Sequence, residues 1–210
     1  TDRPKSQWLK PGNQTSELGI LEVKTYTTNF SILGIWNGIL QIILYGFDHI
    51  LFILGLFFFS HKLKPLLIQV TTFTIAHSIT LIFGGLGYIT ISPHIIEVII
   101  AASIIWIGFE NLFRKKMKVS RIGVIFTFGL IHGLGFANMF KLKGLEGTDY
   151  YLNLLSFNIG IELGLLITLL PLIILIPLFN RLSWYRILIA MPASIIIALF
   201  GVEMFIDRIL

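Results

Sequence analysis

Six long apolar runs, separated by short polar breaks, constrain this sequence more than any other feature. A helix that crosses a membrane needs about 20 predominantly apolar residues. Each run reaches that length, so the sequence predicts an all-α fold, a polytopic membrane helical bundle of about six transmembrane helices. The runs are Ser31–Ser60, Pro65–Leu86, Pro93–Phe113, Arg121–Phe140, Tyr150–Phe179 and Trp184–Ile206.

The composition excludes several classes of function. Hydrophobic residues make up 55% of the chain and charged residues 13%, which leaves no stretch for a separate soluble core. The net charge of +5 comes from Lys and Arg in the breaks and the polar start, so we expect a lipid bilayer and no nucleic acid as partner. With no Cys, any chemistry must use His, carboxylates and hydroxyls.

The chain divides into a polar lead, residues 1–30, and a transmembrane bundle, residues 31–210. Basic residues gather in alternate breaks, and such loops face the cytoplasm in membrane proteins. This pattern predicts a protein of the bacterial cytoplasmic (inner) membrane with cytoplasmic basic loops, and with both termini and the lead outside. The basic residues are Lys62, Lys64, Arg114, Lys115, Lys116, Lys118, Arg121, Arg181 and Arg186.

The first run is too long for one straight crossing. As a helix, Ser31–Ser60 would measure about 45 Å, against a hydrocarbon core of about 30 Å. We therefore expect this helix to tilt strongly or to break, with Gly34, Gly38 and Gly46 as weak points. A break would allow a seventh helix.

Ionisable side chains recur at nearly one depth on four of the predicted helices. Each charge at the bilayer centre costs about 2.5–3.5 kcal/mol, so these groups should face the bundle interior and find partners there. Imidazole nitrogens and carboxylate oxygens are good ligands for divalent cations. The pattern predicts a site for Ni, Co or Zn, with these candidate ligands: Asp48, His49, His77, His132 and Glu162.

Small and amide residues surround this level. Gly129 and Gly133 on one run, and Gly160 and Gly164 on another, predict close helix contacts. The amides of Asn37, Gln41 and Asn158 are candidates to orient the ligands. Glu97 lies near the outer end and is a candidate guard of an entrance. Glu110 is interpreted as structural, with Arg114 one turn away.

Four motifs occur in order between about Gly34 and Arg208. They are GFDHILF from Gly46, TFTIAHSITL from Thr72, HGLGFA from His132 and FNIGIELG from Phe157. As a set they resemble the HupE/UreJ family of hydrogenase and urease accessory membrane proteins. The resemblance implies a nickel or cobalt permease, partners in metalloenzyme maturation, and Asp48, His49, His77 and His132 as ion-handling residues.

Three functions remain open at this point. The first is a permease for a divalent metal. The second is an intramembrane zinc-dependent hydrolase of lipid or peptide, with His49, His77 and His132 as ligands, Asp48 or Glu162 as general base, and Ser78 assisting. The third is a structural or accessory subunit whose polar layer pins helices together. Whether the protein is an enzyme is left open.

Overall fold

The computed structural model describes residues 32–59, 62–113, 117–141, 148–179 and 184–210, with only the backbone of 138–141 and 148–149. The polar lead predicted at 1–30 lies outside these residues. The described residues form helices and connecting turns, with no strand among them. The helices are the segment Ile32–Tyr45, which ends in the π-helical turn η1 (Gln41–Tyr45), then α2 (Phe47–Phe59), α3 (Leu63–Gly85), α4 (Pro93–Phe113), α5 (Val119–Lys141), α6 (Thr148–Phe179), η2 (Arg186–Ala190) and α7 (Met191–Ile209).

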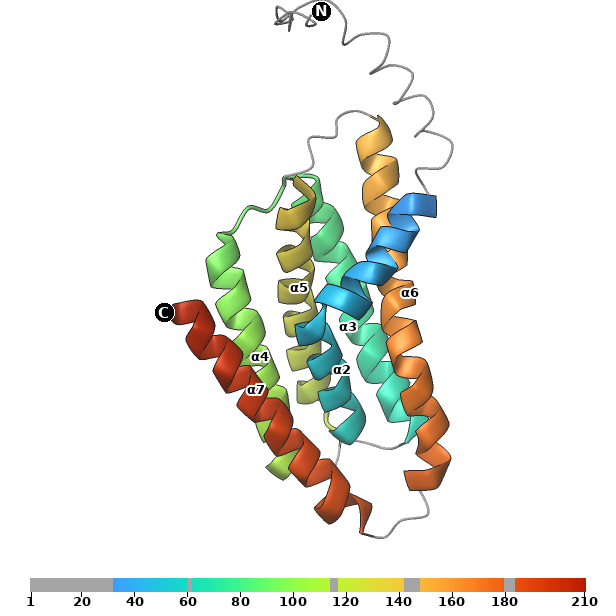
Figure 1. Ribbon diagram of the computed structural model, residues 1–210, viewed down its shortest axis with the longest axis vertical. Helices are drawn as coiled ribbons and strands as arrows, with labels where there is room; N and C mark the ends of the chain where they lie inside the picture. The colour runs from blue at the N-terminus through green and yellow to red at the C-terminus, as the bar shows by residue number, and fades with distance from the viewer. Residues whose placement is uncertain (1–31, 60–61, 114–116, 142–147, 180–183) are drawn as a thin grey trace, which may run out of the picture.

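The helices confirm the predicted membrane bundle. Five of the described helical stretches are long and apolar enough to cross a membrane. The segment Ile32–Tyr45 and α2 pass the same test together as a pair bent by 74°, which gives up to six spans if this pair is counted as one. The protein is therefore an integral membrane protein with a helical bundle (Figure 1).

The first run breaks at Gly46, one of the three expected weak points. The backbone N–H of Gly46 donates to the carbonyl of Ile42 at 3.1 Å, and a Cβ on this residue would lie 2.8 Å from that same oxygen. Only glycine permits this close approach, so the π-helical turn can end and α2 can begin in a new direction. The two halves pass the membrane test only together, so no seventh span is found among the described residues. As a result, α2 starts in the middle of the bundle (Figure 1).

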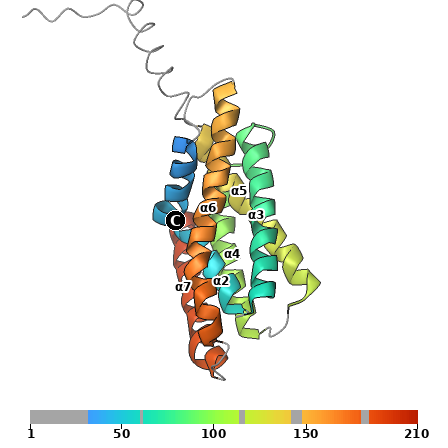
Figure 2. The same ribbon diagram turned by 90° about the vertical axis from the view of Figure 1, so that its right-hand side faces the viewer.

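Glycines let two pairs of helices pack closely, at the positions predicted from sequence. In α5, a Cβ on Gly129 would lie 2.6 Å from the Phe73 carbonyl, and one on Gly133 would overlap the His77 carbonyl, so α5 packs directly on α3. In α6, Gly160 lies against Gly38 of segment Ile32–Tyr45. That segment runs beside α6 in both side views (Figures 1 and 2).

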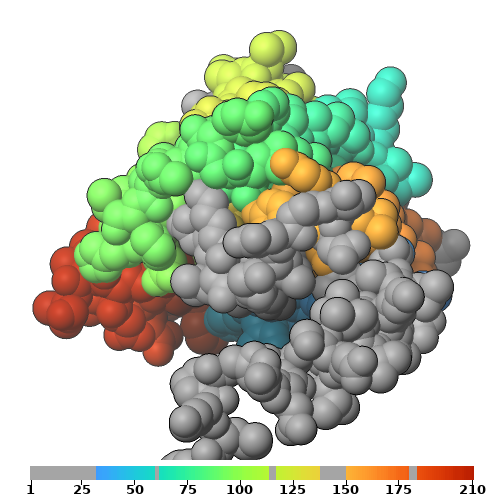
Figure 3. All heavy atoms as spheres, turned by 90° about the horizontal axis from the view of Figure 1, so that it is seen from above, coloured from blue at the N-terminus to red at the C-terminus, as the bar shows by residue number. Residues whose placement is uncertain are grey.

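The remaining pair, α4 and α7, packs along one edge of the bundle, as the view from above shows (Figure 3). Gly108 of α4 faces Ser194 of α7, where a Cβ would lie 2.7 Å from the Ser194 carbonyl. The space between the helix pairs is filled by fully buried apolar side chains. These include Phe52, Ile53, Leu56, Phe73, Leu81, Ile104 and Ile107.

A buried ion pair lies deep in the bundle, and it corrects an expectation from sequence. The sequence predicts Arg121 in a basic loop, yet its side chain is fully buried. Its guanidinium donates to Glu110 at 2.5 Å, to Gln69 at 2.8 Å and to Asn111 at 3.2 Å, and it lies 3.7 Å over the ring of Phe59. The polar groups of the guanidinium are thereby satisfied within the protein.

Asn111 connects this network by hydrogen bonds to α2 and α7. Its amide donates to the carbonyl of Gly55 in α2 at 2.7 Å and to the hydroxyl of Ser194 in α7 at 3.2 Å. Glu110 is therefore structural, as expected, but it pairs with Arg121. The partner expected from sequence, Arg114, lies outside the described residues.

Candidate metal-binding site

Three imidazoles from three helices meet inside the bundle. The ring centroid of His49 in α2 lies 5.4 Å from that of His77 in α3 and 4.7 Å from that of His132 in α5. All three side chains are buried, with 2% or less of each residue exposed. The helix positions that the sequence placed at one depth thus bring their side chains together.

Asp48 stands beside this cluster in the first turn of α2. Its Oδ1 lies 2.8 Å from Nδ1 of His49 and accepts the backbone N–H of His49 at 2.9 Å. The positive end of the α2 dipole also favours a carboxylate at this position. Because a carboxylate only accepts hydrogen bonds, Nδ1 of a neutral His49 carries the proton. Its Nε2 then holds a lone pair, and that atom is buried without a hydrogen-bond partner.

Ser103 in α4 orients His132 in the same way. The Ser103 hydroxyl has one proton and donates it to the carbonyl of Ile100 at 2.6 Å, so it accepts from Nε2 of His132 at 2.9 Å. The lone pair of His132 is then on Nδ1, which is buried without a partner. Sequence reasoning missed Ser103, since one hydroxyl in an apolar run gives no distinct signal.

His77 contributes a third such atom, because its Nε2 is also buried without a hydrogen-bond partner. A buried polar atom that makes no hydrogen bond costs about 1–3 kcal/mol, and three imidazole nitrogens in one cluster share this state. Unprotonated imidazole nitrogen is the form that binds metals. In the described residues, however, no three His, Asp or Glu side chains are placed so that together they could hold a metal ion.

Glu162 in α6 makes a different contact. Its Oε1 accepts a hydrogen bond from the hydroxyl of Ser78 at 2.6 Å, and Ser78 directly follows His77 in the sequence. Of the amides expected to orient ligands, Asn158 is buried with its Oδ1 unpartnered, whereas Asn37 is exposed. Gln41 lines the cleft described next. That Glu162 is a metal ligand remains a prediction.

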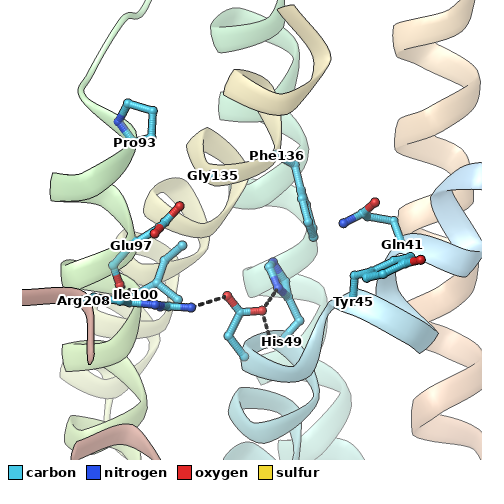
Figure 4. Close-up of a pocket in the computed structure, with 10 residues that line it drawn as sticks. Gln41, Tyr45, His49, Pro93, Glu97, Ile100, Gly135, Phe136 and Arg208 are labelled. Atoms are coloured by element: carbon cyan, nitrogen blue, oxygen red, sulfur yellow. Dashed lines mark hydrogen bonds and ion pairs between the residues drawn. The ribbon is translucent and has the colours of Figure 1, made fainter. Parts of the chain in front are cut away.

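A cleft of about 260 Å³ reaches Asp48 and, of the three imidazoles, His49, and Figure 4 shows the side chains that line it. The residues that line it are Gln41, Tyr45, Asp48, His49, Pro93, Glu97, Ile100, Gly135, Phe136 and Arg208. Phe136 stacks on His49 with ring centroids 4.6 Å apart. Glu97, the candidate guard of an entrance, thus lies in this cleft.

Arg208, near the end of α7, is a cleft residue that sequence reasoning missed. One of its guanidinium nitrogens lies 3.7 Å from Oδ2 of Asp48, and the other donates to the backbone carbonyl of Glu97 at 2.8 Å. Figure 4 shows Arg208 beside Glu97 and Ile100, across the cleft from Gln41 and Tyr45. In the sequence this arginine reads as an ordinary charge at a helix end.

Aromatic rings close the cluster on the side away from the cleft. Phe52 and Phe73 are fully buried and stack with centroids 4.8 Å apart. The His132 ring lies 5.0 Å from Phe52 and 5.2 Å from Phe73. The Arg121 network lies beyond these rings, about 16 Å from His132 along α5. The arrangement is a cleft with carboxylates, then imidazoles, then an apolar layer.

The comparisons with known proteins agree with the motifs. The sequence model of one family, described as HupE / UreJ protein, matches residues 19–208. No curated protein and no solved structure gives a significant match.

Proposed function

The chain belongs to the HupE/UreJ family, and on that premise we propose that it is a permease for Ni²⁺ or Co²⁺. Membership of this family suggests nickel or cobalt handling at a membrane. The observation that carries the proposal is the set of three buried imidazole nitrogens without hydrogen-bond partners at the end of a cleft that contains carboxylates. In this proposal His49, His77, His132 and Asp48 bind the cation in transit.

The chemistry of these groups suits such a cargo. Neutral imidazole nitrogen binds Ni, Co and Zn, and a carboxylate offsets part of the charge of a cation that has left water. Asp48 and Ser103 each accept a hydrogen bond from one nitrogen of an imidazole, so that the other nitrogen carries the lone pair that a metal needs. Glu162 is a further proposed ligand, and it would have to leave its hydrogen bond with Ser78 to reach the cation.

The direction of transport depends on which end of the bundle faces the cytoplasm. The cleft opens between the beginning of α4 and the end of α7, away from the basic breaks. By the positive-inside rule we propose that these breaks face the cytoplasm of a bacterial cell and that the cleft and both termini face outward. The apolar layer of Phe52 and Phe73 then closes the inner route, and transport requires it to open. We further propose that the cargo serves metalloenzyme maturation in the cytoplasm.

Uptake into proteoliposomes tests this function. We expect His77→Ala and His132→Ala each to lower Ni²⁺ or Co²⁺ uptake by about tenfold or more. His94→Ala is the matched control, because His94 is exposed at the start of α4. Elemental analysis of purified wild-type and His132→Ala protein gives the bound metal directly. Unchanged uptake in both cluster variants would rule the proposal out.

One observation favours a second candidate, an intramembrane zinc-dependent hydrolase. The Ser78 hydroxyl and the Glu162 carboxylate form a 2.6 Å hydrogen bond beside His77, which is a pairing that could move a proton. His49, His77 and His132 would hold the zinc, with Asp48 or Glu162 as general base. This candidate requires a tightly bound zinc and a lipid or peptide hydrolysis that chelation abolishes. The third function, a structural subunit, predicts that alanine at His49, His77 or His132 lowers the stability of the protein without changing its content of bound metal.

A further inference from the structure

We infer that Arg208 is a resident cation of the cleft, which pairs with Asp48 until a divalent cation displaces it and which thereby sets the selectivity of the site. The inference rests on the proposed permease function and names a specificity-determining residue for it. Its basis is the guanidinium nitrogen 3.7 Å from Oδ2 of Asp48, inside the cleft that leads to the imidazoles.

The surroundings of Arg208 favour a positive charge at this position. Arg208 lies in the last turn of α7, where the helix dipole favours positive charge. Its second nitrogen donates to the Glu97 carbonyl at 2.8 Å. Its side chain is 22% exposed and that of Asp48 is 17% exposed, so neither charge is fully screened by water. Among the described residues that line the cleft, Arg208 is the one arginine or lysine, and Asp48 and Glu97 are the two carboxylates.

The two contacts of the guanidinium differ in kind. The contact with Glu97 has the length of a good hydrogen bond, whereas 3.7 Å to Asp48 is an ion pair without one. Arg208 can therefore give up Asp48 and keep its anchor on α4. Oδ1 of Asp48 is already engaged with His49, so Oδ2 is the oxygen left for an incoming cation. That oxygen is the one that faces Arg208.

Competition at Oδ2 produces selectivity by charge. A monovalent cation that replaces the guanidinium exchanges one positive charge for another and gains little. A divalent cation brings twice the charge to Asp48 and also reaches the imidazole nitrogens, so it gains enough to displace the guanidinium. The competition also weakens binding of the cargo, because only the fraction of molecules with Asp48 released can bind it. Weaker binding favours release, which a permease requires.

Binding of Co²⁺ to the purified full chain in detergent tests the inference, with calorimetry for affinity and the cobalt absorption bands for coordination. We expect Arg208→Gln to lower the apparent Kd for Co²⁺ by about tenfold. It should also make Co²⁺ binding more sensitive to competition by Na⁺. Lys118→Gln is the matched control: it removes the same charge from an exposed residue at the other end of the bundle, and its Kd should equal that of the wild type.

Two further variants make the outcome decisive. In an Asp48→Asn background, Arg208→Gln should no longer tighten binding, because the competition has no carboxylate to act on. Arg208→Lys keeps the charge but cannot hold Asp48 and Glu97 with one planar fork, so its Kd should fall between those of the wild type and Arg208→Gln. If Arg208→Gln does not fold, Arg208→Lys decides alone, and a Kd equal to that of the wild type overturns the inference.

The remaining outcomes separate this inference from the proposed function. Co²⁺ binding that is lost in His77→Ala but unchanged or weakened in Arg208→Gln supports the site and overturns the role of Arg208. Absence of Co²⁺ binding in both wild type and Arg208→Gln overturns the site and this inference with it.

Discussion

The hydroxyl of Ser103 lies 2.9 Å from Nε2 of His132, and this contact decides which nitrogen of that imidazole is left to bind a cation. The two residues come from different helices, α4 and α5. The orientation of a proposed ligand therefore depends on how α4 packs against α5.

Ser103→Ala tests that dependence. Loss of the hydroxyl leaves Nε2 of His132 without an acceptor and frees the ring to rotate or to change tautomer. We expect Co²⁺ affinity to fall by about tenfold or more. Ser156→Ala is the control, since Ser156 also bonds a carbonyl of its own helix, at 2.6 Å, in α6. Equal Co²⁺ affinities in Ser103→Ala and wild type, measured by calorimetry, would contradict this role.

Asp48→Asn changes both charge and orientation at the cluster. The amide can still accept from His49, but it no longer offsets the charge of a bound cation. We expect the Kd for Co²⁺ to rise by about 10–100-fold, with the thermal unfolding temperature nearly unchanged. Asp207→Asn removes a carboxylate from the exposed face of α7 and should leave the Kd as it is. A similar rise in both variants would point to a general effect of net charge.

The buried ion pair predicts a separation of stability from binding. Arg121→Met removes the guanidinium from its ion pair with the buried Glu110 carboxylate, and breaking a buried pair typically costs about 3–5 kcal/mol. Unfolding in detergent should show this loss. Co²⁺ affinity of the molecules that remain folded should stay within about twofold, because the network lies about 16 Å from His132. Lys118→Met, at an exposed residue just before the start of α5, should change neither quantity.

The contact between α3 and α5 gives a fourth prediction. An alanine at Gly133 would place its Cβ against the carbonyl of His77 and the hydroxyl of Thr80, forcing the helices apart where His77 and His132 meet. We expect a loss of stability of about 1–3 kcal/mol together with weaker Co²⁺ binding. Gly123→Ala is the matched control in the same helix, since nothing lies within 4 Å of its added Cβ. Normal Co²⁺ binding by Gly133→Ala would show that the close contact does not position the imidazoles.

Much of the fold could be predicted because the bilayer imposes lengths. The apolar runs predict the positions of the helices, and the fixed rise per residue of an α-helix predicts that His49, His77 and His132 lie at one depth. Gly129 and Gly133 marked where α3 and α5 touch, since small residues allow helices to approach. Gly46 was one of three candidate break points, and the sequence did not distinguish it from the others.

The polar partners could not be predicted in the same way. Arg121 follows four basic residues in one break and reads as part of a loop, and only the packing of α5 places it inside. Gln69 and Asn111, two amides within apolar runs, are the residues of the sequence that could have indicated a buried charge nearby. Ser103 and Arg208 depend on which helix faces which, and no periodicity in a single helix contains that information.

The break at Gly46 divides the first span between two neighbours. Segment Ile32–Tyr45 is fastened to α6 through the contact between Gly38 and Gly160, whereas α2 is fastened to α4 by the hydrogen bond from Asn111 to Gly55. Any rotation of α6 relative to α4 must therefore be taken up at this joint. Asp48 is two residues away, so its carboxylate is the first ionisable group after the break that such a rotation would turn.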